Sequence, residues 1–343
     1  MKEKIKTLSA GLIIIALTAM LMFYSPQAKA GAIKGGELCS GIIIPSLLPM
    51  LILTSTLCKS KISDMINSFF APVTQKALHL PAPSASAIIF GLVGGYPTGA
   101  VLTRELYQSG EISKAQARRI MHFNICPGLA FSVNAVGSLY NDRSKTGFVI
   151  YLICLFSSLL TAFVEGLWHK NEQITAKTKR QSMKYSDAFC YSVGLTANSL
   201  LIMCCYIIFF SSVNEIINIP RILTPIMEIT NGIFSSQKPI PLPYLCFFME
   251  LSGLCIQMQI AGIANDFDMH PYELIVSRCI ASLIAYFPGK IYVTLYPEQA
   301  EVFSNIAYAT PKISSVSYGF ASVLLLGCIV IVADIKNRKS KLI

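Results

Sequence analysis

Long apolar runs separated by short polar connections are the dominant pattern along this chain. About 20 consecutive apolar residues cross the hydrocarbon core of a bilayer as a helix. Four runs reach that length clearly: Leu8–Tyr24, Phe148–Trp168, Phe189–Val213 and Val316–Ala333. A fifth, Ser40–Leu57, is interrupted by two prolines. Two weaker candidates are Cys126–Tyr140 and Ile280–Leu295. Runs of this length indicate helices rather than barrel strands. The pattern therefore predicts an all-α polytopic membrane protein.

Two further apolar segments are broken near their middle, and they lie 160 positions apart. Each starts with a Pro-x-Pro sequence; the first covers Pro81–Ala100 and the second covers Pro241–Ile260. Interrupted hydrophobic segments at corresponding places in two halves of a chain point to the substrate site of a transporter. We therefore expect interrupted or re-entrant helices at both places.

The basic linker 169–187 divides the chain into two halves that align weakly with each other. Matches lie 153 positions apart before the interrupted segments and 160 apart within and after them, which an insertion around Asn231–Ser236 explains. The pattern predicts two repeats, which we expect to be related by inversion. The expected division is residues 1–30, an N-terminal signal-like or anchoring helix; 31–168, the first repeat; 169–187, the cytoplasmic linker; 188–335, the second repeat; and 336–343, a basic tail.

Each half reads as a span, an amphipathic stretch, an interrupted segment and two further helices. The amphipathic stretches are Ile62–Leu80 and Ile216–Thr230, and each resembles an interfacial helix. An inverted arrangement would put Arg104–Arg119 on the basic cytoplasmic side and the acidic region Asp266–Glu273 on the opposite side. It also predicts opposite sides for the termini, although both termini are basic, so the side of the C-terminus stays open.

Composition supports a membrane protein and argues against nucleic-acid binding. Hydrophobic residues make up 53% of the chain and charged residues 13%, and the net charge of +10 comes from basic clusters at span ends. Such clusters are typical of orientation signals. The eleven cysteines are odd in number and include no C-x-x-C pair, which favours buried small side chains over a disulfide framework. The basic start followed by Ala28-Lys-Ala30 also fits a secretory signal; we favour an uncleaved first helix.

The first interruption is rich in glycine and contains a proline. Pro97 removes a backbone donor, and the glycines permit unusual dihedral angles, so a helix should break here and expose unpaired N–H groups. Such a helix end suits a carboxylate or a phosphate. The alternative is a simple kink or close helix packing. The candidate substrate-binding residues are Gly94, Gly95, Pro97, Thr98 and Gly99.

A second group combines a Pro-Gly pair with amides on either side: Asn124, Pro127, Gly128 and Asn134. Amides bind ligands that carry hydroxyls, ring nitrogens or carboxylates. In membranes they also form hydrogen bonds between helices. Both interpretations stay open for this group, and the four residues are kept as candidate substrate-binding positions.

Glu250 is the most costly residue in the chain, because it lies inside the apolar sequence FFMELSGL. A carboxylate in a membrane span costs a few kcal/mol and must pair, take a proton or face water. Arg278 is a candidate partner. Glu250 is a candidate coupling or gating group unless its segment is shallow, and Ser252, Gln257 and Gln259 are candidate substrate-binding residues of the same cavity.

Arg104, Arg118 and Arg119 flank the first interruption, either as orientation charges or as an electropositive entrance that attracts an anion. The four histidines are scattered, and no nucleophile–base, Walker or metal-binding motif is present. We therefore expect no enzyme activity, no cofactor and no metal. An intramembrane enzyme lacks support in this sequence.

Several short motifs resemble the YlbJ family of sporulation integral membrane proteins, within the wider nucleoside-recognition or Gate-domain group. The resemblance runs over roughly residues 20–300 and rests on these segments: Pro45–Pro49, Gly95–Ala100, Leu106–Ser113, Asn124–Gly128, Ala135–Gly137, Glu228–Gly232 and Ser252–Gln257. The family pattern has paired amides and a polar Pro-Gly-Pro where this chain has Asn-Ile-Cys-Pro-Gly-Leu. That departure bears on the substrate more than on the fold.

The resemblance implies two Gate-like repeats, a bacterial cell membrane or outer forespore membrane, and transport of dipicolinic acid during spore maturation. The expected partners are a small anionic substrate and the lipid bilayer, without nucleic acid and with homo-oligomerisation left open. Two alternatives remain. One is a structural or signalling component of the spore envelope that transports nothing, and the other is a nucleoside-type transporter.

Overall fold

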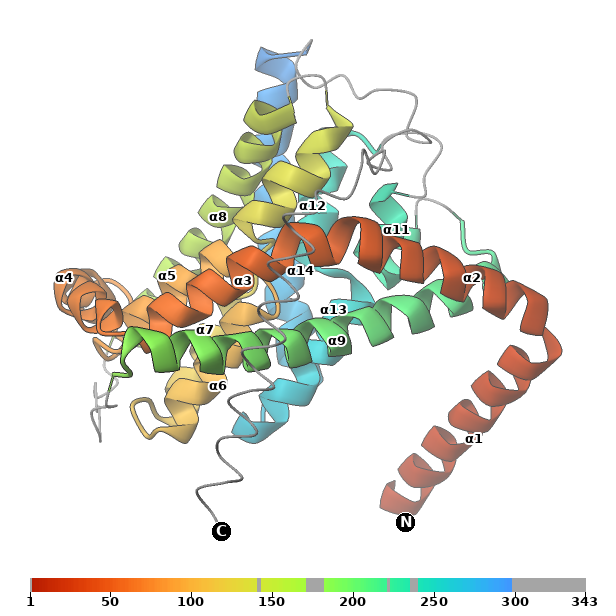
Figure 1. The fold of residues 1–343 in the computed structure, drawn as a ribbon, viewed down its shortest axis with the longest axis horizontal. Helices are drawn as coiled ribbons and strands as arrows, with labels where there is room; N and C mark the ends of the chain where they lie inside the picture. The colour runs from red at the N-terminus through yellow and green to blue at the C-terminus, as the bar shows by residue number, and fades with distance from the viewer. Residues whose placement is uncertain (1, 141–142, 171–181, 221–222, 235–239, 298–343) are drawn as a thin grey trace. The chain divides into compact units, whose positions relative to one another are not determined.

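The computed structural model describes residues 2–140, 143–170, 182–220, 223–234 and 240–297. The chain divides into two units, Met1–Ile306 and Ala307–Ile343, and all described residues belong to the first. The predicted span Val316–Ala333, the basic tail and most of the basic linker lie outside the described residues. Figure 1 shows the helices of the first unit.

Within the described residues, five helical segments are long and apolar enough to cross a membrane, which confirms an all-α polytopic membrane protein. They are Ser25–Lys59, Lys145–Trp168, Tyr185–Ile217, Leu242–Phe267 and Pro271–Leu295. Their outer faces carry large apolar side chains, such as Phe156, Leu201 and Phe287, each more than half exposed. Apolar surface of this kind is stable against lipid. No strand occurs among the described residues, where one isolated bridge joins Ser60 and Met183.

The N-terminal region forms two helices with a bend between them. Helix α1 covers Lys2–Phe23, and α2 covers Ser25–Leu38 with a proline in its first turn, where proline is tolerated. A π-helical turn, η1 (Cys39–Ile43), joins α2 to α3 (Ile44–Lys59), so that the first long span is one continuous helical segment. This segment passes through residue 30, where the sequence suggested a boundary.

The long segment α2–α3 packs antiparallel to α9, which covers Tyr185–Ile217. At one end Lys34 pairs with Glu215 at 2.8 Å, and at the other the backbone N–H of Met183 donates to the Lys59 carbonyl at 3.0 Å. Gly31 allows the close approach, because a β-carbon there would lie 2.5 Å from the Ser211 carbonyl oxygen. The two helices run side by side in Figure 1.

Shorter helices fill the first half between α3 and the next long helix. They are α4 (Ile62–Lys76), α5 (Ser84–Gly94), α6 (Thr98–Gln108), α7 (Lys114–Phe123), the π-helical η2 (Phe131–Val136) and the 3-10 turn η3 (Gly137–Leu139). Helix α8 (Arg143–Trp168) follows. The predicted weak span Cys126–Tyr140 is wrong, because residues 125–128 are not helical and the rest is irregular.

The second half contains α10 (Thr224–Met227), α11 (Ile229–Phe234), α12 (Leu242–Leu251), α13 (Gly253–Ala264), the 3-10 turn η4 (Asn265–Phe267) and α14 (Pro271–Leu295). The predicted amphipathic helix Ile216–Thr230 is wrong. Its first residues complete α9, and Glu228 adopts an extended conformation that separates α10 from α11.

The acidic region Asp266–Glu273 lies beside the α6–α7 connection, which corrects the prediction of opposite sides. Gln108 donates to Asp266 at 3.2 Å, and Arg118 pairs with Glu273 at 2.6 Å. Lys114 also pairs with Asp268. These contacts show that the acidic region and the α6–α7 connection meet at one end of the helices, where their charges neutralise one another.

Candidate functional site

The first interruption is a sharp reversal between α5 and α6, as its glycines and proline predict. Gly94 ends α5, Gly95 has a φ of 82°, and α6 begins at Thr98 after a cis Tyr96–Pro97 peptide bond. A β-carbon on Gly91 would lie 2.7 Å from the α-carbon of Gly99, eight residues later. In a straight helix these residues would be about 12 Å apart. The chain therefore folds back on itself here.

Asn124 joins the two arms of this reversal. Its amide nitrogen donates to the carbonyls of Ala87 on α5 and Gly99 on α6, at 3.2 and 3.3 Å, and the residue is fully buried. The absence of side chains at Gly91 and Gly99 leaves room for this amide. The structure gives Asn124 a positioning role between the arms, and its Oδ1 has no hydrogen-bond partner among the described residues.

The Pro127–Gly128 segment packs directly against the first interruption. The N–H of Tyr96 donates to the Cys126 carbonyl at 3.0 Å, and a β-carbon on Gly128 would meet the Gly94 carbonyl. These contacts satisfy backbone groups that the broken helices leave open. Asn134 does not join the group, because it lies on the exposed face of η2.

The second interruption is a local break between α12 and α13 rather than a reversal. Ser252 and Gly253 both have positive φ, at 68° and 64°. Gln257 donates to the Leu251 carbonyl at 2.9 Å, and the Ser252 hydroxyl donates to the Glu250 carbonyl at 3.1 Å. Two of the predicted polar residues therefore satisfy the backbone of the break itself.

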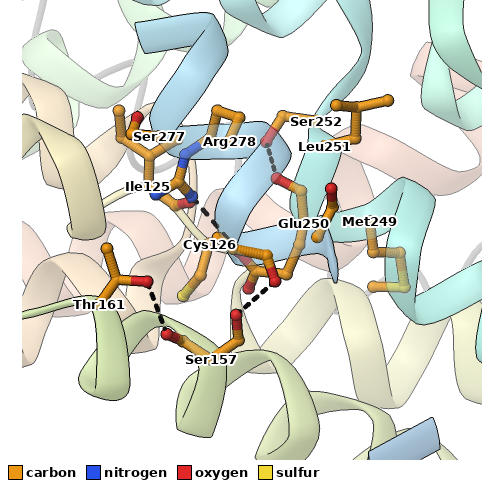
Figure 2. Close-up of polar contacts among 12 residues, drawn as sticks. Ile125, Cys126, Ser157, Thr161, Met249, Glu250, Leu251, Ser252, Ser277 and Arg278 are labelled. Atoms are coloured by element: carbon orange, nitrogen blue, oxygen red, sulfur yellow. Dashed lines mark hydrogen bonds and ion pairs between the residues drawn. The ribbon is translucent and has the colours of Figure 1, made fainter. Parts of the chain in front are cut away.

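Glu250 and Arg278 form a fully buried ion pair, with 3.3 Å between Nη1 and Oε2. Arg278, on α14, also donates to the backbone carbonyls of His122 and Ile125, where α7 ends. Figure 2 shows the arginine lying between Ile125 and Glu250. A buried charge needs partners of this kind, although Arg278 Nε and Glu250 Oε1 have no hydrogen-bond partner among the described residues. The pair therefore connects α12 and α14, in the second half of the chain, to the segment around residues 122–125 in the first half.

Tyr96 makes a further link between the halves. Its hydroxyl donates to the Met249 carbonyl at 3.5 Å, one residue before Glu250. Tyr96 is 7% exposed. The first interruption, the Asn124–Gly128 segment and the break in α12–α13 therefore lie close together in space.

The three flanking arginines have separate surroundings. Arg118 is half-buried and pairs with Glu273, and Arg119 is buried and donates to the carbonyls of Leu78 and His79 at 2.7 and 3.2 Å. Arg104 is half-buried on α6. Two of the three thus hold other parts of the fold, and their role in attracting an anion stays a prediction.

A small, partly open cavity of about 20 Å³, with room for about one water molecule, lies where these elements meet. Most of its wall is apolar, and the polar exceptions come from the breaks: Ile43, Leu47, Tyr96, Gly128, Phe131, Met203, Ile207, Glu228, Ile229, Thr230, Ile256 and Gln259. Ligand sites for drug-sized molecules usually enclose about 300–1,000 Å³, so a substrate would enter this cavity only after the surrounding helix breaks move apart. Of the predicted residues, Gly128 and Gln259 line it directly, while Thr98 and Pro97 line a separate, smaller cavity against α9.

The sequence analysis did not single out Tyr96, Glu228 or Thr230 as site residues. Glu228 is 1% exposed, and its carboxylate accepts the backbone N–H groups of Thr230 and Asn231 at 2.8 and 2.5 Å. The sequence nevertheless contains a signal for Tyr96 and Glu228. Tyr96 belongs to the glycine-rich interruption, and Glu228 belongs to the segment Glu228–Gly232, which resembles the YlbJ family. The burial of Glu228 could not be predicted from the sequence, because this residue lies in the connection between two short helices.

The described residues contain no group of three histidine, cysteine or acidic side chains that could hold a metal ion. The cysteines of this part of the chain are free. The residues that line the site carry aromatic and aliphatic side chains, one carboxylate (Glu228), one amide (Gln259) and two hydroxyls (Tyr96 and Thr230).

Comparison with known proteins identifies a distant relative. The chain is 21% identical to the sporulation integral membrane protein YlbJ of Bacillus subtilis (strain 168), over an alignment of 334 residues that covers 82% of each chain. No family's sequence profile matches the chain, and no solved structure matches it significantly. The similarity therefore extends over most of both chains rather than over a single motif.

Proposed function

Because this chain is a distant homologue of the sporulation integral membrane protein YlbJ, we propose that it is a sporulation integral membrane protein that carries a small metabolite across a membrane. The leading substrate is dipicolinic acid, an aromatic dicarboxylate, and the leading location is the outer forespore membrane. Both follow from the family resemblance in the sequence.

One observation carries the transport proposal. Helix breaks from both halves of the chain border or adjoin one cavity, through Tyr96 and Gly128 in the first half and Glu228 and Gln259 in the second. Discontinuous helices around a central cavity are the usual binding arrangement of secondary transporters. The first spans of the two halves, α2–α3 and α9, run antiparallel, whereas the α6–α7 connection and the acidic region of the second half meet at one end, so the inverted relation stays a prediction.

Aromatic side chains in the cavity wall would suit a small planar ligand once the helix breaks move apart to widen the cavity. Tyr96 and Phe131 belong to its wall, beside aliphatic residues of η1, α9 and α13. An aromatic ring in contact with such a wall loses apolar surface to water and gains stacking contacts. The polar groups of the breaks would then orient the carboxylates or the ring nitrogen.

The buried Glu250–Arg278 pair is the candidate gate. It connects α12 and α14 to the end of α7, so any movement between the halves must stretch or exchange its bonds. Alternating access needs contacts that break and re-form between the moving parts. The gating role of Glu250 stays a prediction, and this ion pair is the contact through which Glu250 would act.

The alternative of a non-transporting component of the spore envelope uses the same fold without a ligand. The nucleoside-type alternative uses the same cavity with a neutral ligand. Neither has a specific contact in its favour. A direct comparison of substrates separates all three functions.

The test is uptake of labelled dipicolinate by proteoliposomes that contain the purified full chain, with a nucleoside as the competing substrate. We expect saturable uptake of dipicolinate that Gly95→Leu, Asn124→Ala and Glu250→Gln reduce to background. The matched control is Gly262→Leu, because a β-carbon on Gly262 would meet no neighbouring atom within 4 Å. If the proteoliposomes take up neither compound, the transport proposal is contradicted. If they take up the nucleoside alone, the substrate is a nucleoside rather than dipicolinate.

A further inference from the structure

Glu228 is a buried acidic residue that lines the cavity and has no cationic partner among the described residues. Glu228 lies between α10 and α11, outside the five span-length helices, and it is 1% exposed. The ion pairs formed by the described residues do not include it. Glu250, by comparison, has Arg278 as its partner.

Backbone donors hold Glu228 in a fixed orientation. Its two oxygens accept N–H groups of Thr230 and Asn231, at 2.8 and 2.5 Å, and the Asn231 amide donates in turn to the Ser211 hydroxyl on α9. The carboxylate therefore cannot turn away from the cavity without losing both bonds. These bonds stabilise the charged form, while burial in an apolar wall disfavours it.

In the part of the chain that the structure describes, the titratable groups that interact with Glu228 from the surrounding elements are neutral or acidic. They are Cys39 on η1, Tyr96 at the first interruption and Cys255 on α13. None of them supplies a positive charge at neutral pH. Burial raises the pKa of the Glu228 carboxyl above its usual range, and the hydrogen bonds from Asn231 and Thr230 oppose that shift.

We infer that Glu228 binds the proton that accompanies an anionic substrate into the cavity. The inference rests on the proposed transport of an anion. Two like charges within one apolar cavity repel strongly, because the dielectric screening there is weak. A proton on Glu228 removes that repulsion and leaves an O–H group that can donate to a substrate carboxylate. Substrate and proton therefore enter together.

The experiment measures dipicolinate binding to the purified full chain in lipid nanodiscs at several pH values. Dipicolinate carboxylates stay ionised between about pH 6 and pH 8, so a change in affinity reports the protein. With one proton taken up per ligand, affinity falls about tenfold per pH unit above the pKa of Glu228. We expect this fall in the unmodified protein and a nearly constant affinity in Glu228→Gln. Glu215→Gln, which changes an exposed ion pair on α9, should keep the pH dependence of the unmodified protein.

A second measurement covers the case in which Glu228→Gln does not fold, since glutamine cannot accept both backbone N–H groups. Calorimetric titration of the unmodified protein in buffers with different ionisation enthalpies gives the number of protons taken up on binding. One proton per ligand supports the inference. Binding with no proton uptake, or an unchanged pH dependence in Glu228→Gln, overturns the inference while leaving transport intact. Absence of dipicolinate binding at every pH contradicts the proposed function instead.

Discussion

At the scale of single residues, a few buried polar groups connect the elements of the core through hydrogen bonds to backbone carbonyls. Arg278 is the clearest example, since its guanidinium contacts Glu250 and two backbone carbonyls. An arginine can supply several donors in a fixed plane, which suits it to join three elements. A lysine, with one compact charge, would not reproduce this geometry.

Replacement of Glu250 should destabilise the protein strongly. Glu250→Gln leaves the Arg278 charge buried without a counter-charge, and breaking a buried pair in this way costs about 3–5 kcal/mol. We expect a clearly lower midpoint of thermal unfolding in detergent or nanodiscs. The control is Lys34→Met, which removes an exposed pair with Glu215 and should cost about 1 kcal/mol or less. Equal midpoints for the two variants would show that Glu250 and Arg278 do not form the pair.

At the scale of helices, the sequence predicted the breaks better than the regular segments around them. Gly95 and Pro97 predict the first break because the break depends on the local conformational preferences of these two residues. The irregular conformation of the segment after Asn124 was harder to predict, because its backbone carbonyls accept hydrogen bonds from Tyr96 and Arg278, which are distant in sequence. Apolar content alone therefore suggested a span there. Glu228 was missed for the same reason, because its burial depends on α9 and α13.

Close packing between the arms of the first reversal gives a second prediction. Gly99→Ala would bring a methyl group into contact with the Asn124 carbonyl, and the neighbouring backbone has little freedom to move. Overpacking of this kind costs about 1–3 kcal/mol or more. We expect reduced yield of folded protein by fluorescence-detected size exclusion, while Gly262→Ala keeps the normal profile. A normal profile for Gly99→Ala would contradict the fold-back of α5 and α6.

At the scale of the described unit, the two halves meet through ion pairs as well as through the cavity. The sequence placed the acidic region opposite the α6–α7 connection, because charge patterning was interpreted as membrane orientation. The structure pairs the two regions instead, as Arg118 and Glu273 illustrate. Sequence charge alone cannot distinguish a residue that orients a span from one that neutralises a neighbour.

Cross-linking tests this arrangement. Cysteines at Gln108 and Asp266, in a background without other cysteines, should react with a short bifunctional thiol reagent, because these side chains are hydrogen-bonded at 3.2 Å. Both single cysteines should also be labelled by an impermeant reagent from one side of oriented membranes. A Gln108–Glu215 cysteine pair serves as the control, since Glu215 lies in the last turn of α9 and pairs with Lys34 of α2. Labelling from opposite sides would restore the arrangement expected from the sequence.

The central claim is that the cavity between the helix breaks is the substrate site, and one measurement tests it most directly. Met203 lines this cavity from α9, whereas Ser199, one turn earlier on the same helix, lines the separate cavity beside Thr98. In a background without other cysteines, we expect a bulky thiol reagent to stop dipicolinate uptake through Met203→Cys and to spare Ser199→Cys. Dipicolinate present during labelling should protect Met203→Cys. Full uptake after complete modification of Met203→Cys would contradict the claim.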